Sequence, residues 1–373
     1  MPDSQRLVDL VQSRIDRDLA ERRELLAGID VALLPPLALA EQLMRGGKRF
    51  RARFLFWGWH AVAARESGID PLAKWSDSAD LDAVITVAAA LEYFQGSALV
   101  HDDLIDDSDT RRGHPSMHRA LAARHSDDRR HGDPDAFGRS AALLVGDLLF
   151  GWSDELFGAG VSALAERTRA IAARRIFDRM RTDVISGQYL DLLEEHRAPE
   201  AIDGDALTRA HKVIVYKSAR YSVEAPLALG AAMAGASEQQ SAALRAFGLP
   251  LGVAFQLRDD MLGVFGDSSV TGKPAGDDLR AGKQTVLVAV ARQKLPRTIA
   301  TLLDEMLGDP ALDDTQISML RTALQDCGAA DQVERFIERE SARAAAALET
   351  APISTEAKRQ LLDLVDAATR RDR

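Results

Sequence analysis

The chain has 373 residues, with 57 acidic and 47 basic side chains and a formal net charge of −10. This acidic balance argues against a general nucleic-acid-binding protein. The single cysteine, Cys327, excludes an intramolecular disulfide and is typical of a reducing compartment, so we expect a cytoplasmic location. Few aromatic residues and many Ala, Leu, Arg and Glu residues favour helix throughout.

The N-terminal part of the chain predicts two helices and no targeting segment. Residues 4–27 carry an apolar stripe at helical spacing and are charged throughout, without the apolar centre of a signal peptide. Pro35 and Pro36 interrupt this pattern, and a second helix is expected from Leu37 to Met44. Because the chain lacks a run of about 18 apolar residues, we expect no transmembrane segment.

A basic turn follows this second helix. Gly46 and Gly47 permit a tight turn and a close approach of the backbone to a ligand. Lys48 and Arg51 are three residues apart, so both can point the same way from the first turn of the next helix. A cation pair beside a helix N-terminus can bind a diphosphate, and a basic solvated turn is the alternative.

Core helices are expected at residues 54–66 and 80–100, and the second leads into a group of carboxylates. Asp102 and Asp106 are one helical turn apart, and Asp103 lies close enough to share a ligand. Carboxylates at the end of a buried helix are costly unless cations compensate their charge. Oxygen ligands without Cys or a His pair predict a hard cation such as Mg²⁺.

A second acidic pair, Asp259 and Asp260, follows the apolar run Leu244–Leu257. Two such groups facing each other would form a metal-bridged diphosphate site. Arg111 and Arg112 lie shortly after the first group, and they could instead be simple ion-pair partners of its aspartates.

Residues 124–139 are polar, contain Gly and Pro, and are predicted to form a surface loop. His125 and His131 in this stretch lack a regular spacing. We therefore expect them to be solvated rather than to bind a metal.

Later helix patterns cover residues 140–156 and 166–193. The second contains Gln188 and Asp191, polar side chains on an apolar face that need partners in a core or a polar cavity. Lys217 lies in apolar helical sequence and is expected to be half-buried beside an anion.

A glycine-rich stretch with Lys273 and Lys283 follows the second acidic pair, and it does not match a P-loop. The C-terminal helices are amphipathic and have no assigned chemistry. Because long linkers and repeats are lacking, we expect a single domain over residues 1–373, with a motif-bearing core at about 40–290.

Between Gly46 and Lys283 the chain contains, in this order, GGKRFR, DDLID, RRG, GQYLDL, YKS, FQLRDD and GKPAGDDLRAGK. This ordered set resembles the trans-polyprenyl diphosphate synthases. The resemblance implies an all-α helical bundle around a central cavity, a homodimer, and both acidic groups at the cavity mouth. It also implies a prenyltransferase that condenses isopentenyl diphosphate with an allylic diphosphate by Mg²⁺-assisted ionisation, condensation and proton elimination, with three ions when substrate is bound.

The resemblance assigns roles residue by residue. Mg²⁺ on the allylic diphosphate would be held by five aspartates, Asp102, Asp103, Asp106, Asp259 and Asp260. The same diphosphate would be contacted by Arg111, Lys217 and Lys273, with Lys283 close by. Isopentenyl diphosphate would be held by Lys48, Arg51 and Arg112, with Gln95 beside them. The carbocation would be flanked by Gln188 and the hydroxyl of Ser218.

Three positions depart from the family pattern. Gly263 stands where the second acidic motif has a third aspartate, and water would fill that ligand position. Gln95 replaces a histidine but can still donate a hydrogen bond to a phosphate oxygen. Ser218 replaces a threonine and keeps the hydroxyl.

The product length is predicted from the helix that carries the first acidic group. Ala98 and Ser97, four and five residues before Asp102, are small, and so the block that stops family members at fifteen carbons is absent. One turn deeper, about 5 Å away, Phe94 and Tyr93 supply bulk. This arrangement favours geranylgeranyl diphosphate, and the alternatives are a farnesyl product or one of 25 or more carbons.

Two other functions remain as alternatives. A class I terpene cyclase would share the ionisation chemistry, but it has no isopentenyl diphosphate site and carries an Asn/Ser/Glu-type second metal motif. A non-catalytic subunit of a heteromeric synthase tends to lose aspartates, whereas the first group here is complete.

Overall fold

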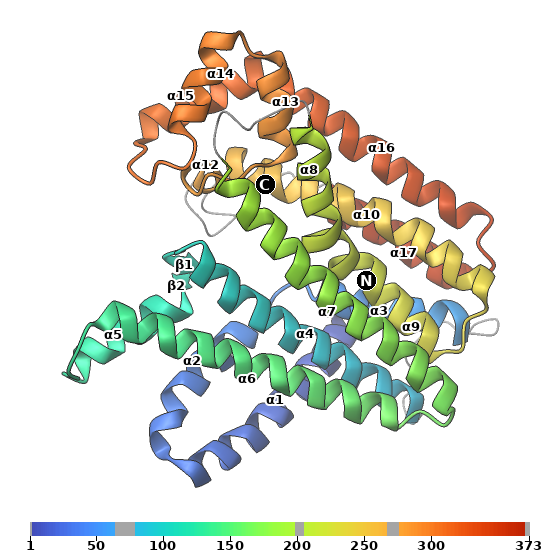
Figure 1. Cartoon of the computed structure of the whole chain (residues 1–373). Helices are drawn as coiled ribbons and strands as arrows, with labels where there is room; N and C mark the ends of the chain where they lie inside the picture. Colours follow the sequence, from blue (N-terminus) through green and yellow to red (C-terminus); the bar gives the residue numbers. More distant parts are fainter. Residues whose placement is uncertain (1, 64–78, 198–204, 267–275, 370–373) are drawn as a thin grey trace. The chain divides into compact units, whose positions relative to one another are not determined.

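The computed structural model of the chain describes residues 2–63, 79–197, 205–266 and 276–369 (Figure 1). Within these residues the fold is helical, apart from a hairpin of two short antiparallel strands, β1 (Thr110–Arg111) and β2 (His114–Pro115). The predicted all-α class is therefore confirmed. The helices up to α6 are α1 (Pro2–Ile29), η1 (Val31–Leu33), α2 (Leu34–Met44), α3 (Phe50–Ala63), α4 (Ala79–Ile105), α5 (Met117–Asp127) and α6 (Pro134–Ser162). They are followed by α7 (Arg167–Glu195), α8 (Ala206–Val213), η4 (Ile214–Glu224), α9 (Ala225–Met233), α10 (Glu238–Phe265), α12 (Asp277–Arg280), α13 (Val286–Lys294), α14 (Arg297–Met306), α15 (Asp314–Asp326), α16 (Ala329–Glu349) and α17 (Thr355–Thr369).

The chain forms two compact units. Unit 1 comprises Met1–Arg174 and Leu229–Gly235, and unit 2 comprises Arg175–Ala228 and Ala236–Arg373. The chain passes from one unit to the other inside α7, inside α9, and again between α9 and α10. The single domain expected from the sequence stays a prediction.

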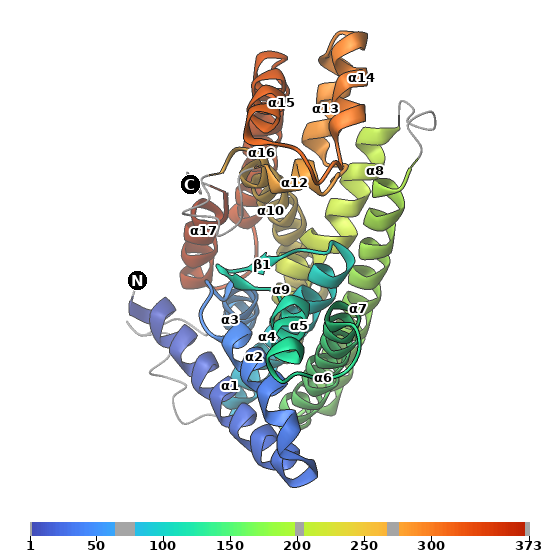
Figure 2. The same cartoon turned by 90° about the vertical axis from the view of Figure 1, so that its left-hand side faces the viewer.

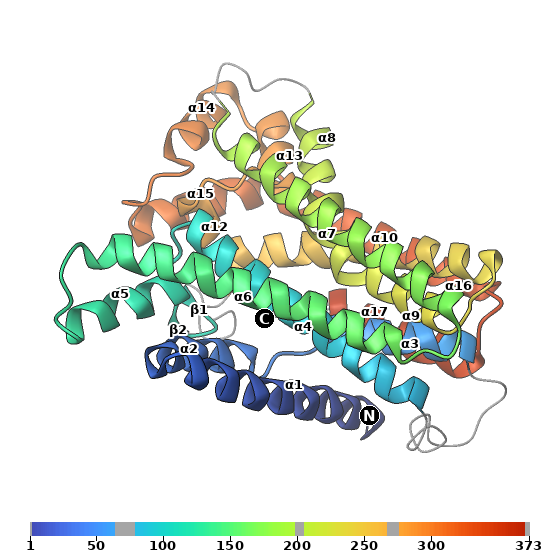
Figure 3. The same cartoon turned by 60° about the horizontal axis from the view of Figure 1, so that its bottom comes forward.

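Helix α4 forms the centre of unit 1. It packs against α6 along much of its length and against α1 and α3, and Figure 2 shows it between α1 and α6. Gly160 of α6 permits this close packing, because a Cβ there would lie 2.7 Å from a methyl group of Val87 and 3.1 Å from the carbonyl oxygen of Ala83. Helix α5 lies alongside the first half of α6 (Figure 3).

Helix α4 also has the length and the apolar composition of a membrane-spanning helix. Residues Asp80–Ile105 have a mean hydropathy of 1.5 over their most apolar window, and 83% of that window is buried in the protein. The apolar side chains of α4 therefore form the core of unit 1, as the sequence predicted for residues 80–100. Among the described residues this is the helix with the length and composition to cross a bilayer.

Helix α10 has the same central place in unit 2. It packs against η4 and α16, and Figure 1 shows α10 in yellow beside α16 in red. The apolar side chains of α16, among them Val333 and Ile337, are buried against α10 and α13. This burial explains why a strongly charged C-terminal helix is nevertheless stable as part of the core.

The segment that contains Lys217 is not the single α-helix that the sequence pattern suggested. Residues Ile214–Glu224 form a π-helix, η4, between α8 and α9. A π-helix is rarely favoured by local sequence and is common at functional sites. Lys217 and Ser218 both lie on this π-helix.

The surface loop predicted at residues 124–139 is confined to residues 128–133, between α5 and α6. The stretch contains the end of α5 and the start of α6, and Pro134 begins α6 after Asp133, whose side chain accepts a hydrogen bond from the backbone N–H of Asp135. His125 is buried rather than solvated, with its ring 4.9 Å from that of Phe137. The polar residues of this stretch belong to the solvated faces of two helices, which sequence composition does not distinguish from a loop.

Two helix boundaries also differ from the prediction. Helix α2 begins at Leu34, because Pro35 and Pro36 are tolerated in a first helical turn, where a backbone N–H has no intrahelical partner. Helix α3 begins at Phe50, so Lys48 precedes it and only Arg51 lies in its first turn.

Candidate active site

A tight hairpin directs two consecutive arginines of unit 1 to different partners. Thr110 pairs with Pro115 and Arg111 with His114, and the two turn residues, Arg112 and Gly113, have positive φ angles of 54° and 76°. A two-residue turn of this kind needs positive φ at both positions, and glycine at the second makes it accessible. The RRG sequence thus sets the geometry of both arginines.

Arg111 forms an ion pair with the first acidic group. Its Nε lies 2.9 and 3.2 Å from the two carboxylate oxygens of Asp103, and its Nη2 bonds Asp103 and lies 3.3 Å from Oδ2 of Asp102. Burial acts to lower the pKa of Arg111, but Asp103 and the neighbouring aspartates outweigh it and raise the pKa. Asp103 itself is 2% exposed. The ion-pair interpretation therefore describes Arg111 in this structure.

Arg112 points to the end of α2. Its Nη1 donates hydrogen bonds to the carbonyl oxygens of Leu43, at 2.9 Å, and Arg45, at 3.3 Å. Burial, followed by the charge of Arg49, lowers the pKa of Arg112. Gly47, with a φ of +88°, passes so close that a Cβ there would lie 3.4 Å from the guanidinium of Arg112. The structure thus brings the GGKR turn and the RRG turn together.

The basic turn before α3 has one buried and two accessible cations. Lys48 is exposed and Arg51 is half-buried, whereas Arg49 is 4% exposed and forms a 2.6 Å ion pair with Glu92 of α4. Gln95 is half-buried on α4, less than one turn after Glu92. Sequence reasoning missed the Arg49–Glu92 pair, although a single acid in the apolar run before Tyr93 signals a need for a buried cation.

The residues chosen for product length point in different directions from α4. The Tyr93 hydroxyl donates a 2.7 Å hydrogen bond to Asp18 of α1, so Tyr93 takes part in the packing of α1 on α4. The ring of Phe94 lies 5.9 Å from that of Phe150 on α6. Ser97 is buried and Ala98 is half-buried. Tyr93 and Phe94 meet different neighbours because consecutive helical residues are rotated by roughly 100°.

Two lysines of unit 2 meet carboxylates of α7. Lys217 Nζ donates a 2.6 Å hydrogen bond to Oδ2 of Asp191, and Lys283 Nζ lies 2.6 Å from Oε1 of Glu195 and 3.7 Å from Oδ2 of Asp191. The predicted half-burial of Lys217 and the predicted need of Asp191 for a partner are both confirmed. Glu195 was missed, although it lies one helical turn after Asp191 and so shares its face.

Two glycines set the position of Lys217 on the π-helix. A Cβ at Gly187 of α7 would lie 2.5 Å from the carbonyl carbon of Tyr216 and 2.6 Å from Cα of Lys217. On the other side, a Cβ at Gly252 of α10 would lie 2.7 Å from Cα of Ala219. Both helices therefore touch the backbone of η4 directly, which fixes the site of Lys217 by packing.

Two further predicted residues lie on the same helices. Gln188 is half-buried next to Gly187 on α7, and Ser218 is 8% exposed on η4. Lys273, the remaining predicted cation, lies outside the described residues.

The second acidic pair lies near the end of α10. Asp260 is 8% exposed and accepts a 2.8 Å hydrogen bond from Nε2 of Gln256. Burial raises the pKa of Asp260 to about 8, and the charges of Asp278, Asp259 and Asp191 add to this rise. A cation close to Asp260 would favour its ionised form.

Arg258, which precedes this pair, has a structural partner. It forms two 2.6 Å bonds with Glu334 of α16 and donates a 2.8 Å hydrogen bond to the carbonyl oxygen of Thr369. The arginine of FQLRDD therefore holds α10 to the C-terminal helices.

The candidate ligands are carboxylate oxygens, which are the ligand type that a hard cation such as Mg²⁺ prefers. In each unit, carboxylate oxygens lie beside a lysine or an arginine. Among the described residues, no group of three or more His, Cys, Asp or Glu side chains is arranged to hold a metal ion. In unit 1 the guanidinium of Arg111 forms ion pairs with Asp103 and Asp102. Mg²⁺ commonly takes only one or two carboxylates and completes its shell with water and phosphate oxygens, so it does not require such a cluster.

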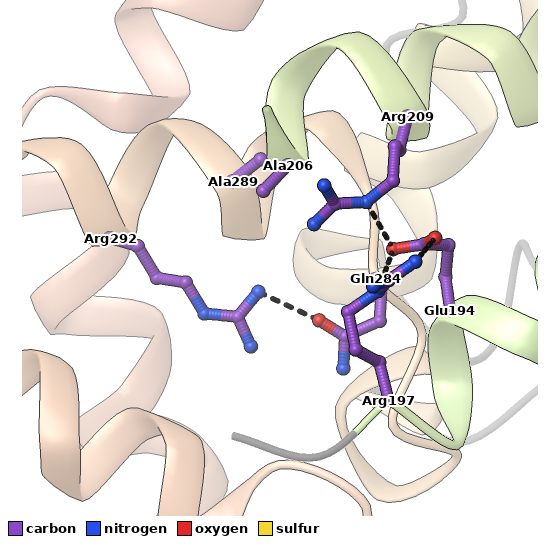
Figure 4. A pocket seen from close by; sticks show the side chains of 7 residues that line it. All are labelled: Glu194, Arg197, Ala206, Arg209, Gln284, Ala289 and Arg292. Atoms are coloured by element: carbon purple, nitrogen blue, oxygen red, sulfur yellow. Dashed lines mark hydrogen bonds and ion pairs between the residues drawn. The ribbon is translucent and has the colours of Figure 1, made fainter. Parts of the chain in front are cut away.

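A small basic pocket in unit 2 was not predicted (Figure 4). It is lined by Glu194, Arg197, Ala206, Arg209, Gln284, Ala289 and Arg292. Burial tends to raise the pKa of Glu194, but hydrogen bonds from Arg197 and Arg209 outweigh burial and lower it. Arg292 bonds Gln284 at 2.7 Å and Asp304 at 2.6 Å. These pairs connect α7 with α8, and α13 with α14, within unit 2.

Comparison with known proteins gives the class of the protein. The family model described as polyprenyl synthetase matches residues 37–324. A short chain isoprenyl diphosphate synthase of Methanocaldococcus jannaschii is 30% identical over 241 residues, which cover 64% of this chain and 64% of that relative, just under two thirds of its length. The octaprenyl diphosphate synthase of Escherichia coli is 26% identical, with 93% of this chain and 96% of the relative covered.

A solved structure matches along nearly the whole chain. It is the geranylgeranyl pyrophosphate synthase of Corynebacterium glutamicum, complexed with isoprenyl diphosphate and magnesium. It has a TM-score of 0.89 and 35% sequence identity, and 99% of each chain is covered. The chain belongs to the polyprenyl synthetase family, and it is an enzyme of the trans-isoprenyl diphosphate synthase class.

Proposed function

We propose that this prenyltransferase condenses isopentenyl diphosphate with an allylic diphosphate in a reaction that depends on Mg²⁺. The observation that carries the proposal is the pairing of acidic and basic side chains in both units: Arg111 with Asp103, and Lys217 with Asp191. A diphosphate with bound Mg²⁺ can replace both members of such pairs, since it offers anionic oxygens to the cations and a metal to the carboxylates. The magnesium and isoprenyl diphosphate bound to the Corynebacterium glutamicum enzyme support this assignment.

The first step is cleavage of the allylic C–O bond. We assign Arg111, Lys217, Lys273 and Lys283 to the leaving diphosphate, where their positive charges stabilise the negative charge that develops. When bound, Mg²⁺ supplies Lewis-acid stabilisation of the same oxygens. We propose three ions, held by Asp102, Asp103, Asp106, Asp259 and Asp260.

The second step is attack by the isopentenyl double bond on the allylic cation. Lys48, Arg51 and Arg112 would hold the isopentenyl diphosphate, with Gln95 donating a further hydrogen bond. The oxygen atoms of Gln188 and Ser218 would flank the cation and stabilise it by their dipoles. The released diphosphate would then take the proton, which ends the cycle.

We propose geranylgeranyl diphosphate as the main product. The tail would run along α4 from Asp102 past the small residues Ala98 and Ser97. It would stop at Phe94, whose ring is supported by Phe150 of α6. Phe94 lies one helical turn, roughly 5 Å, deeper than positions 97 and 98, where bulky residues stop elongation at fifteen carbons, so the chain would have room for one more isoprene unit. Related enzymes with geranylfarnesyl and octaprenyl products make a longer chain the alternative.

We also propose a cytoplasmic homodimer. Helix α6 carries several exposed apolar side chains, Phe137, Leu143, Leu144 and Leu148, of which Leu144 is 63% exposed. A second copy of the chain would cover them, because an apolar stripe on one helix can pack against its symmetry-related copy.

Product analysis tests this function. The purified chain would be incubated with Mg²⁺, labelled isopentenyl diphosphate and each allylic starter of five, ten or fifteen carbons, and chain lengths would be read after dephosphorylation. A dominant twenty-carbon alcohol is expected. Cyclic hydrocarbons without incorporation of label would favour a terpene cyclase, and absence of any turnover would favour a non-catalytic subunit.

A further inference from the structure

The buried arginine of the GGKR turn joins three other helices of unit 1. Arg49 is 4% exposed, and its Nη1 lies 2.6 Å from Oε2 of Glu92 on α4. Its Nη2 donates hydrogen bonds to Oε1 of Gln12 on α1 and to the carbonyl oxygen of Met44 at the end of α2. A guanidinium presents its donors in a rigid fork, so one side chain can bond all three helices at once. The side chain of Arg49 is therefore fixed by the core.

The backbone of Arg49 connects two cations that the proposed function assigns to isopentenyl diphosphate. Lys48 directly precedes it in the chain. The carbonyl oxygen of Arg49 accepts a 3.0 Å hydrogen bond from the N–H of Arg53, which begins α3 and places Arg51 in its first turn. Arg49 has a φ of +49°, a conformation that is unfavourable for a residue with a Cβ and persists where surrounding contacts hold it. The anchored guanidinium supplies such contacts.

The third cation assigned to isopentenyl diphosphate shares the same anchor. Arg112 donates hydrogen bonds to the carbonyl oxygens of Leu43 and Arg45. The carbonyl oxygen between them, that of Met44, accepts from Arg49. The last carbonyl groups of a helix lack intrahelical partners and carry partial negative charge, so they attract cations. The end of α2 thus bonds a guanidinium from each of the two turns, and a shift of Arg49 would disturb the support of Arg112.

We propose that Arg49 is a positioning residue for isopentenyl diphosphate, and that its pair with Glu92 sets the relative places of the three cations assigned to this substrate. The role of Arg49 rests on the proposed function, in which those cations bind isopentenyl diphosphate. Arg49 acts through its neighbours, because its own side chain is 2% exposed and is paired with Glu92. Arg111 bonds Asp103 rather than the end of α2, so the allylic diphosphate should depend less on Arg49.

Steady-state kinetics of the full chain separate positioning from stability. The test variant combines Arg49→Met with Glu92→Leu. Removing one member of a buried ion pair is strongly destabilising, whereas replacing both by apolar side chains is often neutral. The double variant should therefore unfold near the temperature of the parent, yet its KM for isopentenyl diphosphate should rise by about 10- to 100-fold. Its KM for the allylic starter should stay near that of the parent.

Two single variants complete the test. Arg49→Lys keeps the charge beside Glu92, but an ammonium lacks the fork that reaches three helices, so the KM for isopentenyl diphosphate should rise here too. This variant serves if the double variant does not fold. Glu41→Gln is the matched control, because Glu41 of α2 pairs with Arg23 of α1 at 2.6 Å. It removes an ion pair between two of the same helices and leaves the turn unchanged, so both KM values should stay at the parent level.

The positioning role of Arg49 is refuted if the double variant regains both the unfolding temperature and the KM for isopentenyl diphosphate of the parent. It is also refuted if the KM values of the two substrates rise equally, or if Glu41→Gln raises the KM for isopentenyl diphosphate as much as Arg49→Lys does. A parent protein that incorporates no isopentenyl diphosphate with any allylic starter would instead overturn the proposed function, and the role of Arg49 with it.

Discussion

Gly187→Ala tests whether close packing on the π-helix positions Lys217. The new methyl carbon would lie 2.5 Å from the carbonyl carbon of Tyr216 and 2.6 Å from Cα of Lys217, whereas ordinary contact begins at 3.4 Å. Because the amide nitrogen of Lys217 lies closer still, the backbone of η4 would have to retreat by more than about 0.9 Å. Overpacking of this kind costs about 1–3 kcal/mol, and the better helix propensity of alanine offsets roughly 0.5–1 kcal/mol of it.

The expected effect on catalysis is larger than that on stability. A displacement of about 1 Å of a positioned catalytic group can cost roughly 100-fold in rate. We therefore expect Gly187→Ala to lower kcat by about 10- to 100-fold and to lower the thermal midpoint modestly. Steady-state kinetics with saturating substrates and thermal unfolding followed by circular dichroism measure the two effects.

Gly158→Ala on α6 is the matched control. A Cβ at Gly158 meets nothing within 4 Å, so this variant should keep kcat and unfold at the same or a higher temperature. The packing argument is refuted if Gly187→Ala behaves like Gly158→Ala. If Gly187→Ala loses stability but keeps kcat, the glycine protects the fold and not the position of Lys217.

Three further predictions concern other parts of the chain. Asp103→Ala should lower turnover by at least about 100-fold while circular dichroism shows the helix content of the parent, and retained activity would remove the first acidic group from the mechanism. Phe94→Ala should lengthen the product in the dephosphorylation assay, and an unchanged product would refute its role as the floor. Glu194→Gln should lower the free energy of unfolding at neutral pH by about 1–3 kcal/mol, because the hydrogen bonds that Glu194 accepts from Arg197 and Arg209 are weakened. The folded-state pKa of Glu194 is lowered, so its contribution is present above the unfolded pKa and is lost as the pH falls through the folded value. The difference between Glu194→Gln and the parent should therefore disappear in acid, and a difference that is constant with pH would contradict this.

Local sequence features predicted most of the helices and the residue types of the site. Apolar periodicity identified α1, α4 and α10, because burying one face of a helix leaves a repeat that is visible in sequence. The first acidic group was predicted on the same ground, since the spacing of Asp102 and Asp106 alone brings them to one face. The prediction made the loop at residues 124–139 too long, because the solvated faces of the two helices that flank residues 128–133 have the composition of a loop.

Contacts between distant segments were decided by the tertiary structure. The direction of Tyr93 depends on Asp18, which lies 75 residues earlier, and the buried partner of Arg49 is Glu92 of another helix. The π-helix that carries Lys217 packs directly on glycines of α7 and α10. The helix propensity of its own residues does not reflect these contacts.

The sequence by itself determined the all-helical class, the two acidic groups and the cations of a diphosphate-binding enzyme, because helix periodicity and residue chemistry are local properties. The tertiary structure alone decided which of these side chains meet: Arg111 with Asp103, Lys217 with Asp191, and Arg49 with Glu92. The physical reason is that such contacts depend on how helices far apart in the sequence pack, and a side chain's partner is set by the register of that packing rather than by its sequence neighbours.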